Sequence, residues 1–296
     1  MLSFFKKYSK LFLKGSRVKT LLMSLIPSFM SMALVYKHSF VFDKTLFLLT
    51  CFSILFIQIA VNLFNDALDG KEGLDNKKER LGPLRLVGSG EASFFEVRAM
   101  GFFACIMAVL LAIPLIFKGG ILVLIMGFLS LLSCYFYTGS SYSLVKMGLA
   151  EIFCFIFFGF FIVFGVYYIQ TLKFSWDLIY LSIQCGFWSV SFLLINYLRD
   201  EKIDKKRGRK HFVTLLGREN SLFVVGVFQA FIYLLCFYWL NSYPKAGILS
   251  FCAIFFSCFL LYQMYQRTSQ KYNQCLAFLS FSYSFFCFMW ILGLFL

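Results

Sequence analysis

The feature that most constrains this chain is a succession of nine long apolar runs. They lie at about residues 20–36, 45–65, 99–117, 120–138, 149–169, 176–197, 221–240, 246–263 and 276–296. Each is long enough to cross a hydrocarbon core of about 30 Å as a helix that rises about 1.5 Å per residue. Hydrophobic residues make up 60% of the chain, against about 45–50% in soluble domains. We therefore expect an all-α membrane protein, a bundle of nine transmembrane helices.

The first nineteen residues are basic and mildly amphipathic. A signal peptide would also place a basic start before an apolar run, but no small-residue cleavage site follows that run. We interpret residues 1–19 as an uncleaved segment that lies at the membrane surface. Residues 20–296 then form a single transmembrane domain, because short connections between nine helices leave no room for a soluble one.

The distribution of Lys and Arg predicts the side of the membrane that each loop occupies. With a cytoplasmic N-terminus and nine spans, 23 of the 28 Lys and Arg fall in cytoplasmic segments. That bias follows the positive-inside rule. It predicts a multi-pass membrane protein with its C-terminus on the side opposite the N-terminus. The net charge of +14 lies mostly on one membrane face, so it favours contact with anionic lipid over nucleic-acid binding.

The ten cysteines and two histidines predict neither a zinc site nor a disulfide framework. Most cysteines lie in or beside the apolar runs, and no two form a C-x-x-C pair. So few histidines disfavour a zinc site. We interpret the cysteines as small apolar residues in lipid or in helix packing.

The acidic residues are concentrated in two loops. Eleven of the 14 Asp and Glu lie in residues 66–96 and 200–219. The loops that contain them, 66–98 and 198–220, are the longest in the chain, and the topology places both in the cytoplasm. Long loops on a compact scaffold often carry function. Some of their charges are better explained as solvated: Glu91, Glu96, Glu219 and the run Lys205–Arg207.

Each of the two spans that lead into these loops ends in an amide followed by two carboxylates on one helical face. Two sets share this pattern: Asn62, Asp66 and Asp69, and Asn196, Asp200 and Asp204. Like charges on one face repel, so a cation between them is expected. Mg²⁺ prefers oxygen ligands and is usually held by one or two carboxylates together with phosphates. Because Lys and Arg are interleaved with the acids, we expect a bound diphosphate. The alternative is that both sets are solvated helix ends.

The first loop resembles the UbiA superfamily of intramembrane prenyltransferases. It is similar to the pattern N-x-x-N-D-x-x-D-x-x-x-G-x-D, which here runs from Asn62 to Asp75. The pattern R-x-G-P-L-R follows, here from Arg80 to Arg85. The spacing resembles the 1,4-dihydroxy-2-naphthoate polyprenyltransferase branch more than the hydroxybenzoate branch, whose third acid follows more closely.

The second loop resembles the same branch. Its pattern N-x-x-R-D-x-x-x-D-x-x-x-G-K begins here at Asn196, although Arg209 stands at the final position. Between the two loops, the branch has the patterns Y-T-x-G and G-L-G-D/E, which Tyr137-Thr138-Gly139 and Gly148-Leu149-Ala150-Glu151 resemble here. Lys146 departs from the branch, which tends to have glycine there. The resemblance covers about residues 60–217.

The resemblance implies a nine-helix bundle around a central cavity that the two loops cap. It also implies roles for individual residues. The implied Mg²⁺ ligands are Asp66, Asp69, Asp200 and Asp204, assisted by Asn62 and Asn196. The implied diphosphate contacts are Arg80, Arg85, Arg199, Arg209 and Lys210. Glu151 would accept the ring hydroxyl proton or make a structural hydrogen bond, and the roles of three residues stay open: Asp75, Lys146 and Tyr137.

The implied activity is transfer of a polyprenyl group from its diphosphate to 1,4-dihydroxy-2-naphthoate. Loss of CO₂ would give demethylmenaquinone, in menaquinone biosynthesis at the bacterial plasma (inner) membrane. The resemblance implies two Mg²⁺ ions, with Mn²⁺ as a substitute. The aromatic content of 21% suits this, because aromatic faces stabilise carbocations. Another aromatic acceptor, such as hydroxybenzoate, is one alternative. A cation transporter would need acids inside the spans, and a CDP-alcohol phosphatidyltransferase would need Ala-Arg after its first acids. Isoprenoid length and oligomeric state stay open.

Overall fold

The computed structural model describes residues 2–39, 42–73, 81–138, 147–206, 208–266 and 271–296. Within these ranges the chain is helical and contains no strand, so the all-α expectation is confirmed. The elements are α1 (Leu2–Ser16), α2 (Val18–Ser39), α3 (Lys44–Lys71), α4 (Phe94–Thr138), α5 (Ala150–Phe155), the π-helix η1 (Ile156–Phe161), α6 (Ile162–Thr171), α7 (Asp177–Lys206), α8 (Phe212–Leu234), α9 (Cys236–Ser242), α10 (Pro244–Phe251), α11 (Ile254–Gln266) and α12 (Tyr272–Phe295).

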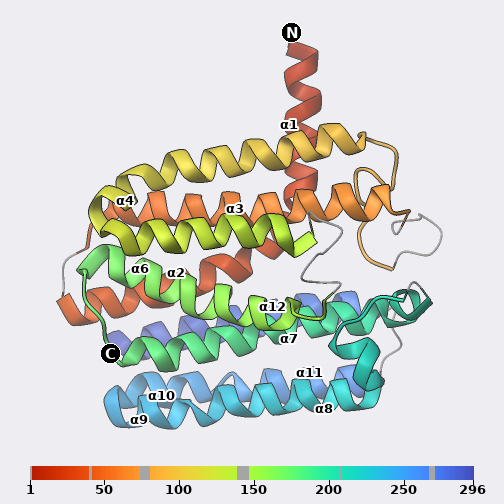
Figure 1. Cartoon of the computed structure of the whole chain (residues 1–296). Helices are drawn as coiled ribbons and strands as arrows, with labels where there is room; N and C mark the ends of the chain where they lie inside the picture. Colours follow the sequence, from red (N-terminus) through yellow and green to blue (C-terminus); the bar gives the residue numbers. More distant parts are fainter. Residues whose placement is uncertain (1, 40–41, 74–80, 139–146, 207, 267–270) are drawn as a thin grey trace.

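The described chain makes nine passes through the bundle. Eight helical stretches within it are long and apolar enough to cross a membrane. The longest is α4, which breaks at Gly120, where φ is 65° and ψ is −151°. Glycine adopts this conformation readily because it has no Cβ. Figure 1 shows the two halves of α4 folded back along each other, so α4 contributes two passes. The expected nine-helix bundle is confirmed.

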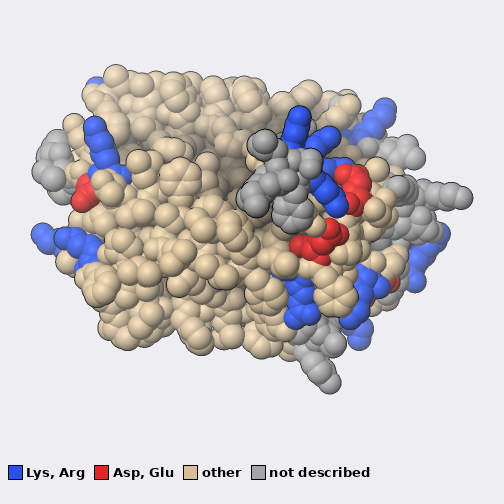
Figure 2. Space-filling view, turned by 90° about the horizontal axis from the view of Figure 1, so that it is seen from above, with Lys and Arg blue, Asp and Glu red and all other residues tan. Residues whose placement is uncertain are grey.

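The distribution of charge on the surface fits a multi-pass membrane protein. Figure 2 shows Lys, Arg, Asp and Glu at the two ends of the long axis of the molecule, with a broad uncharged belt between them. One end, which we call the loop end, is where α3 and α7 terminate (right in Figure 1). Most of the charged residues visible in Figure 2 lie at this end.

The N-terminal helix α1 crosses the bundle instead of running along it (Figure 1). Its buried Leu11 belongs to the same apolar cluster as Leu63 of α3. The hydroxyl of Tyr8 donates a hydrogen bond of 2.6 Å to Glu96 of α4, and Lys14 forms an ion pair with Glu91. These contacts fix the end of α1 beside α3. The membrane-surface position of residues 1–19 stays a prediction.

The core of the bundle is centred on α7, because 67% of the apolar stretch of this helix is buried. Polar side chains inside this core find partners on neighbouring helices. Gln184 donates to the carbonyl of Ile232 at 2.8 Å and accepts from the indole of Trp239 at 2.7 Å. Gln229 donates to the hydroxyl of Ser191 at 3.1 Å. Such pairs stabilise helix association in lipid, where van der Waals packing has no hydrophobic effect to assist it.

A second polar cluster fastens the end of the bundle opposite the loop end. Oδ2 of Asp177 lies 2.9 Å from Nε2 of His38 and accepts a hydrogen bond of 2.9 Å from Tyr243. Its other oxygen accepts from Tyr238. Nδ1 of His38 lies 2.8 Å from the hydroxyl of Tyr167. These residues come from α2, α6, α7 and the α9–α10 region, so the cluster holds four parts of the chain together away from the acidic loops.

The packing of η1 on α7 yields a stability test at Gly159. A Cβ added there would lie 2.5 Å from the backbone oxygen of Ser182, so Gly159→Ala should force the two helices apart. We expect the free energy of unfolding to fall by about 1–3 kcal/mol. Gly127→Ala is the matched control, because nothing lies within 4 Å of a Cβ at Gly127. Thermal unfolding of the purified proteins in detergent measures both, and equal midpoints for Gly159→Ala and wild type would contradict this packing.

Candidate active site at the loop end

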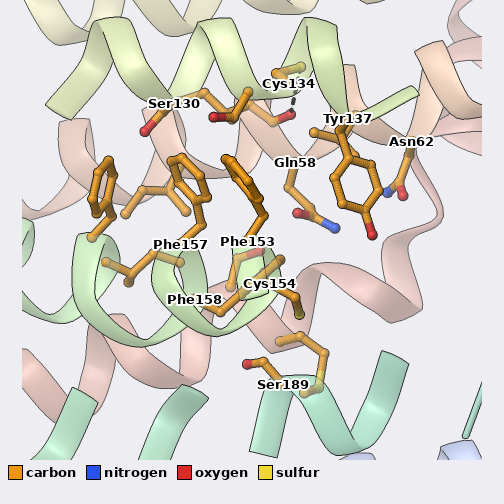
Figure 3. A pocket seen from close by; sticks show the side chains of 18 of the residues that line it. Gln58, Asn62, Ser130, Cys134, Tyr137, Phe153, Cys154, Phe157, Phe158 and Ser189 are labelled. Carbon is orange, nitrogen blue, oxygen red and sulfur yellow. Dashed lines mark hydrogen bonds between the residues drawn. The ribbon is translucent and has the colours of Figure 1, made fainter. Parts of the chain in front are cut away.

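A cavity of about 380 Å³ runs from the loop end into the bundle. The charged residues that line it are Arg17, Asp69, Arg85, Arg199, Asp200, Asp204 and Arg209. Farther in, the wall becomes apolar and aromatic; Figure 3 shows Phe153, Phe157 and Phe158 along it. The cavity therefore joins a charged mouth to a hydrophobic tunnel.

Asp69 stands near the end of α3 and is 8% exposed. Its two carboxylate oxygens accept hydrogen bonds from two different guanidinium groups, Oδ2 from Arg85 and Oδ1 from Arg209. Arg85 also donates to the carbonyl of Asn65 at 2.7 Å. Because Arg85 belongs to the first loop and Arg209 to the second, Asp69 ties the two loops together.

Asp204 completes this link from α7. Its Oδ1 accepts a long hydrogen bond of 3.5 Å from Nη1 of Arg209, and its Oδ2 lies 3.1 Å from Nε2 of His211. The His211 ring is fully buried and stacks on Tyr197, with ring centroids 4.0 Å apart. Arg209 therefore contacts one acid from each of the two sets, and the two carboxylate stripes face each other across the cavity mouth.

Asp200 pairs with its own neighbour in the chain. Both of its oxygens accept from the Arg199 guanidinium, at 2.9 and 2.6 Å. Nη1 of Arg199 donates to Oδ1 of Asn273 at 2.9 Å, and the Asn273 amide donates to the carbonyl of Leu81 at 2.9 Å. A Cβ at Gly82 would lie 3.0 Å from Nη2 of Arg199. The first turn of α12 thus connects the Arg199–Asp200 pair to the first loop.

Asp66 has a different environment from the other three acids. It is 2% exposed, and its oxygens accept the backbone N–H groups of Leu86 and Val87 at 2.9 and 3.0 Å. It is not among the residues that line the cavity. In this structure Asp66 fixes the backbone of the first loop, and its carboxylate would have to turn toward the cavity to bind a metal ion there.

The two asparagines of the predicted stripes lie in the cavity wall. The Asn62 amide donates to the carbonyl of Ser16 at 2.9 Å and lies 3.2 Å from the hydroxyl of Thr20. The Asn196 amide donates to the carbonyl of Phe192, one turn earlier in α7, at 3.1 Å. Asn62 therefore also fastens the junction of α1 and α2 to α3.

The remaining predicted residues occupy varied positions. Tyr137 lines the cavity. Oε1 of Glu151 accepts the backbone N–H of Phe212 at 2.9 Å, at the start of α8, and Glu151 is not part of the cavity lining. Lys210 is exposed and is also outside the lining. Three predictions fall outside the described residues: Asp75, Arg80 and Lys146.

Arg17 is a cavity residue that the motifs did not identify. It lies between α1 and α2 with φ of 52°, in the left-handed region that non-glycine residues rarely adopt. Its Nη2 is buried and has no hydrogen-bond partner among the described residues. Burial lowers the pKa of the Arg17 guanidinium to about 9, with a further contribution from nearby Arg85, and this leaves Arg17 cationic at neutral pH. A cation with a strained backbone and a buried, unpartnered nitrogen points to an anionic ligand.

The carboxylates fit Mg²⁺ only in company with an anion. Within the described part of the chain, no three acidic, His or Cys side chains are placed to hold a metal ion by themselves. The cavity acids Asp69, Asp200 and Asp204 instead face guanidinium groups. Their oxygens suit Mg²⁺, which is usually held by one or two carboxylates plus phosphate oxygens. A diphosphate that attracts the arginines would free the carboxylates for the metal ion.

Comparisons with known proteins show which family the chain matches. The model of the UbiA prenyltransferase family matches residues 24–292. The 1,4-dihydroxy-2-naphthoate octaprenyltransferase of Escherichia coli (strain K12) is 30% identical over 218 residues, which are 71% of this chain and 69% of that protein.

Solved structures show the same fold. The apo structure of a UbiA homolog from Aeropyrum pernix K1 has a TM-score of 0.73 at 16% identity, covering 93% of this chain and 98% of that one. A UbiA homolog from Archaeoglobus fulgidus, bound to GPP and Mg²⁺, has a TM-score of 0.67 at 15% identity, covering 97% and 100%. With its family match, fold and paired acidic loops, this chain belongs to the UbiA prenyltransferase family.

Proposed function

We propose that this prenyltransferase moves a polyprenyl group from its diphosphate to 1,4-dihydroxy-2-naphthoate, with loss of CO₂, to give demethylmenaquinone. One observation carries the proposal: two carboxylate–arginine groups meet at the mouth of a tunnel lined by aromatic side chains. The charged mouth suits a diphosphate, and the tunnel suits its hydrocarbon chain. The Escherichia coli relative, named for the naphthoate reaction, supports this choice of acceptor.

The diphosphate of the donor would bind among the arginines at the cavity mouth. Arg17 has an unpartnered buried nitrogen there, and Arg85 and Arg209 reach the same region from the two loops. Guanidinium groups present paired donors that match phosphate oxygens. Arg80, Arg199 and Lys210 stay proposed contacts from the sequence motifs.

The proposed Mg²⁺ ligands are the motif acids, Asp69, Asp200 and Asp204, with Asp66 joining if its carboxylate turns toward the cavity. Asn62 and Asn196 stand beside them in the wall. Bound Mg²⁺, as two ions or with Mn²⁺ as a substitute, would stabilise the charge that develops on the departing diphosphate.

The tunnel would protect the allylic cation that forms when the C–O bond breaks. Four phenylalanines of the α5–η1 segment line it: Phe153, Phe157, Phe158 and Phe161. Their rings exclude water, and their faces attract a cation. The cation then bonds to the ring carbon of the acceptor that carries the carboxylate. CO₂ leaves, and the electron pair of the broken C–C bond stays with the ring and restores its aromaticity.

Glu151 fits a structural role better than a catalytic one. Its carboxylate accepts the backbone N–H of Phe212 in the first turn of α8. An acid at this position stabilises the free amides and the positive end of the helix dipole. We propose that Glu151 anchors α8 beside His211 and the second loop.

The proposed orientation follows from the Lys and Arg distribution. The loop end and the N-terminus would both face the cytoplasm of a bacterium. The water-soluble diphosphate head of the donor would enter the site from that side. The C-terminus lies at the end opposite the loop end (Figure 1). The acids gather at the loop end and not along the tunnel, which disfavours a cation transporter.

Asp69 provides the first test of the proposed site. Asp69→Asn removes the charge that faces Arg85 and Arg209 and that would bind Mg²⁺, and it should lower kcat/KM by about 100-fold or more. Purified protein with Mg²⁺, geranyl diphosphate and 1,4-dihydroxy-2-naphthoate is assayed for prenylated product and diphosphate. Glu219→Gln, an exposed acid of the second loop, is the control and should keep activity. Full activity of Asp69→Asn, or transfer to 4-hydroxybenzoate alone, would contradict the proposal.

Arg17 provides a second test, because its replacement should leave the stability of the ligand-free protein intact and weaken ligand binding. Its lowered pKa means that the folded protein disfavours the charged form when no anion is bound, so Arg17→Met should not lower the unfolding temperature of the ligand-free protein. The variant should lose most of the stabilisation that Mg²⁺ and diphosphate give to wild type. Lys10→Met, on the exposed face of α1, should retain that stabilisation. Equal stabilisation of Arg17→Met and wild type would exclude Arg17 from the diphosphate site.

A further inference from the structure

The polar stripe on α3 extends one turn deeper than the motif. Gln58, Asn62, Asn65 and Asp69 are spaced i, i+4, i+7 and i+11, which places them on one helical face, and all four line the cavity. Gln58 lies about 16 Å from Asp69 along the helix axis, since each residue rises about 1.5 Å. It therefore stands below the diphosphate-binding region, where the lining changes from charged to aromatic.

The side chain of Gln58 has no hydrogen-bond partner among the described residues, although it lines the cavity. Figure 3 shows its amide projecting into the space between the rings of Phe153 and Tyr137. Two other polar residues of the cavity wall differ from Gln58: Ser130 donates to the carbonyl of Met126 at 2.8 Å, and Ser189 donates to that of Cys185 at 2.9 Å. Gln58 therefore presents both its N–H donors and its carbonyl acceptor to whatever fills the cavity.

A second unpartnered group faces the cavity from α4. Ser133 lines it and has no hydrogen-bond partner in the described structure. It lies at the depth of Gln58, because Cys134 contacts the carbonyl of Ile57 with Sγ 3.9 Å from the oxygen. Tyr137, one turn farther along α4, lines the same cavity. Polar groups of two helices thus meet where the tunnel begins.

A hydrocarbon chain gives these groups no partner. An isoprenoid has neither a donor nor an acceptor, and a buried amide left without a hydrogen bond is costly. The diphosphate lies farther out, among the arginines. The part of the cavity beside Gln58 can therefore hold a second ligand that has an apolar body and polar substituents. An aromatic ring with hydroxyl or carboxylate groups has that chemistry.

We propose that the Gln58 amide, with the Ser133 hydroxyl, binds the oxygen substituents of the aromatic acceptor and sets its ring against the first carbon of the prenyl chain. The acceptor ring must lie near the head of the tunnel, because the first prenyl carbon is joined to the diphosphate there. The two reacting carbons must approach to about 3–3.5 Å. This inference rests on the proposed function. Gln58 acts as a specificity-determining residue for the acceptor and makes no contact with the diphosphate.

The kinetic test separates the two substrates. For Gln58→Leu, which keeps the size of the side chain, the KM for 1,4-dihydroxy-2-naphthoate should rise about tenfold or more. The KM for geranyl diphosphate should change by less than about twofold, because the diphosphate residues are untouched. Ser133→Ala should change the acceptor KM in the same direction. Ser130→Ala is the matched control, since its hydroxyl is bonded to Met126 and its loss should leave both KM values unchanged.

A binding test makes the inference independent of turnover. Protein with Mg²⁺ and inorganic diphosphate is titrated with 1-hydroxy-2-naphthoate, followed by the fluorescence of the naphthoate. Gln58→Leu should weaken this binding about tenfold while its unfolding temperature stays at the wild-type value. An unchanged naphthoate affinity, or a loss that falls on the donor instead, would overturn the role of Gln58. A wild type that binds the naphthoate but transfers no prenyl group would contradict the proposed function, and the affinities would still decide for or against Gln58.

Discussion

The contact on which the site depends is the bridge that Arg209 makes between Asp69 of α3 and Asp204 of α7. Two acid-bearing helix ends would otherwise repel across a buried space. The guanidinium compensates both carboxylates, and with Arg85 on the other oxygen of Asp69 it holds the cavity mouth in a charged but balanced state. Breaking a buried ion pair leaves an uncompensated charge, which is strongly unfavourable. A ligand that displaces Arg209 must therefore bring both anionic and cationic charge, as a magnesium diphosphate does.

Apolar length and the division of residues 99–138 into two runs follow directly from sequence, so the nine-pass bundle was predictable. Helical spacing predicted that Asp69 and Asp204 would each belong to a carboxylate face of one site. Spacing alone did not separate Asp66 from Asp69. At about 100° per residue, Asp66 lies at the edge of the face shared by Asn62 and Asp69, and there it meets the amides of the first loop. The sequence contains no signal of where that loop returns, because its path is set by tertiary packing.

Residues distant in sequence were the hardest to assign to the site. Arg17 belongs to a run of similar basic residues, and only the packing of α1 across α3 brings it into the cavity. Asn273 looks like an ordinary helix start, yet it holds the Arg199 guanidinium that pairs with Asp200. Gln58 is one polar residue in a long apolar run, so its meaning depends on facing a cavity and not lipid. Each case needs the arrangement of several helices, which local pattern does not contain.

The central claim concerns the acids at the cavity mouth, which we infer stay paired with arginines until a diphosphate arrives. Calorimetric titration of Mg²⁺ into purified protein, with and without a non-reactive prenyl diphosphate analogue, tests it most directly. The analogue should tighten Mg²⁺ binding at least tenfold, about 1.4 kcal/mol, because the diphosphate takes Arg85 and Arg209 away from Asp69 and adds its own oxygens. Mg²⁺ binding of the same affinity in both titrations would contradict the claim, since the carboxylates would then form a complete metal site alone.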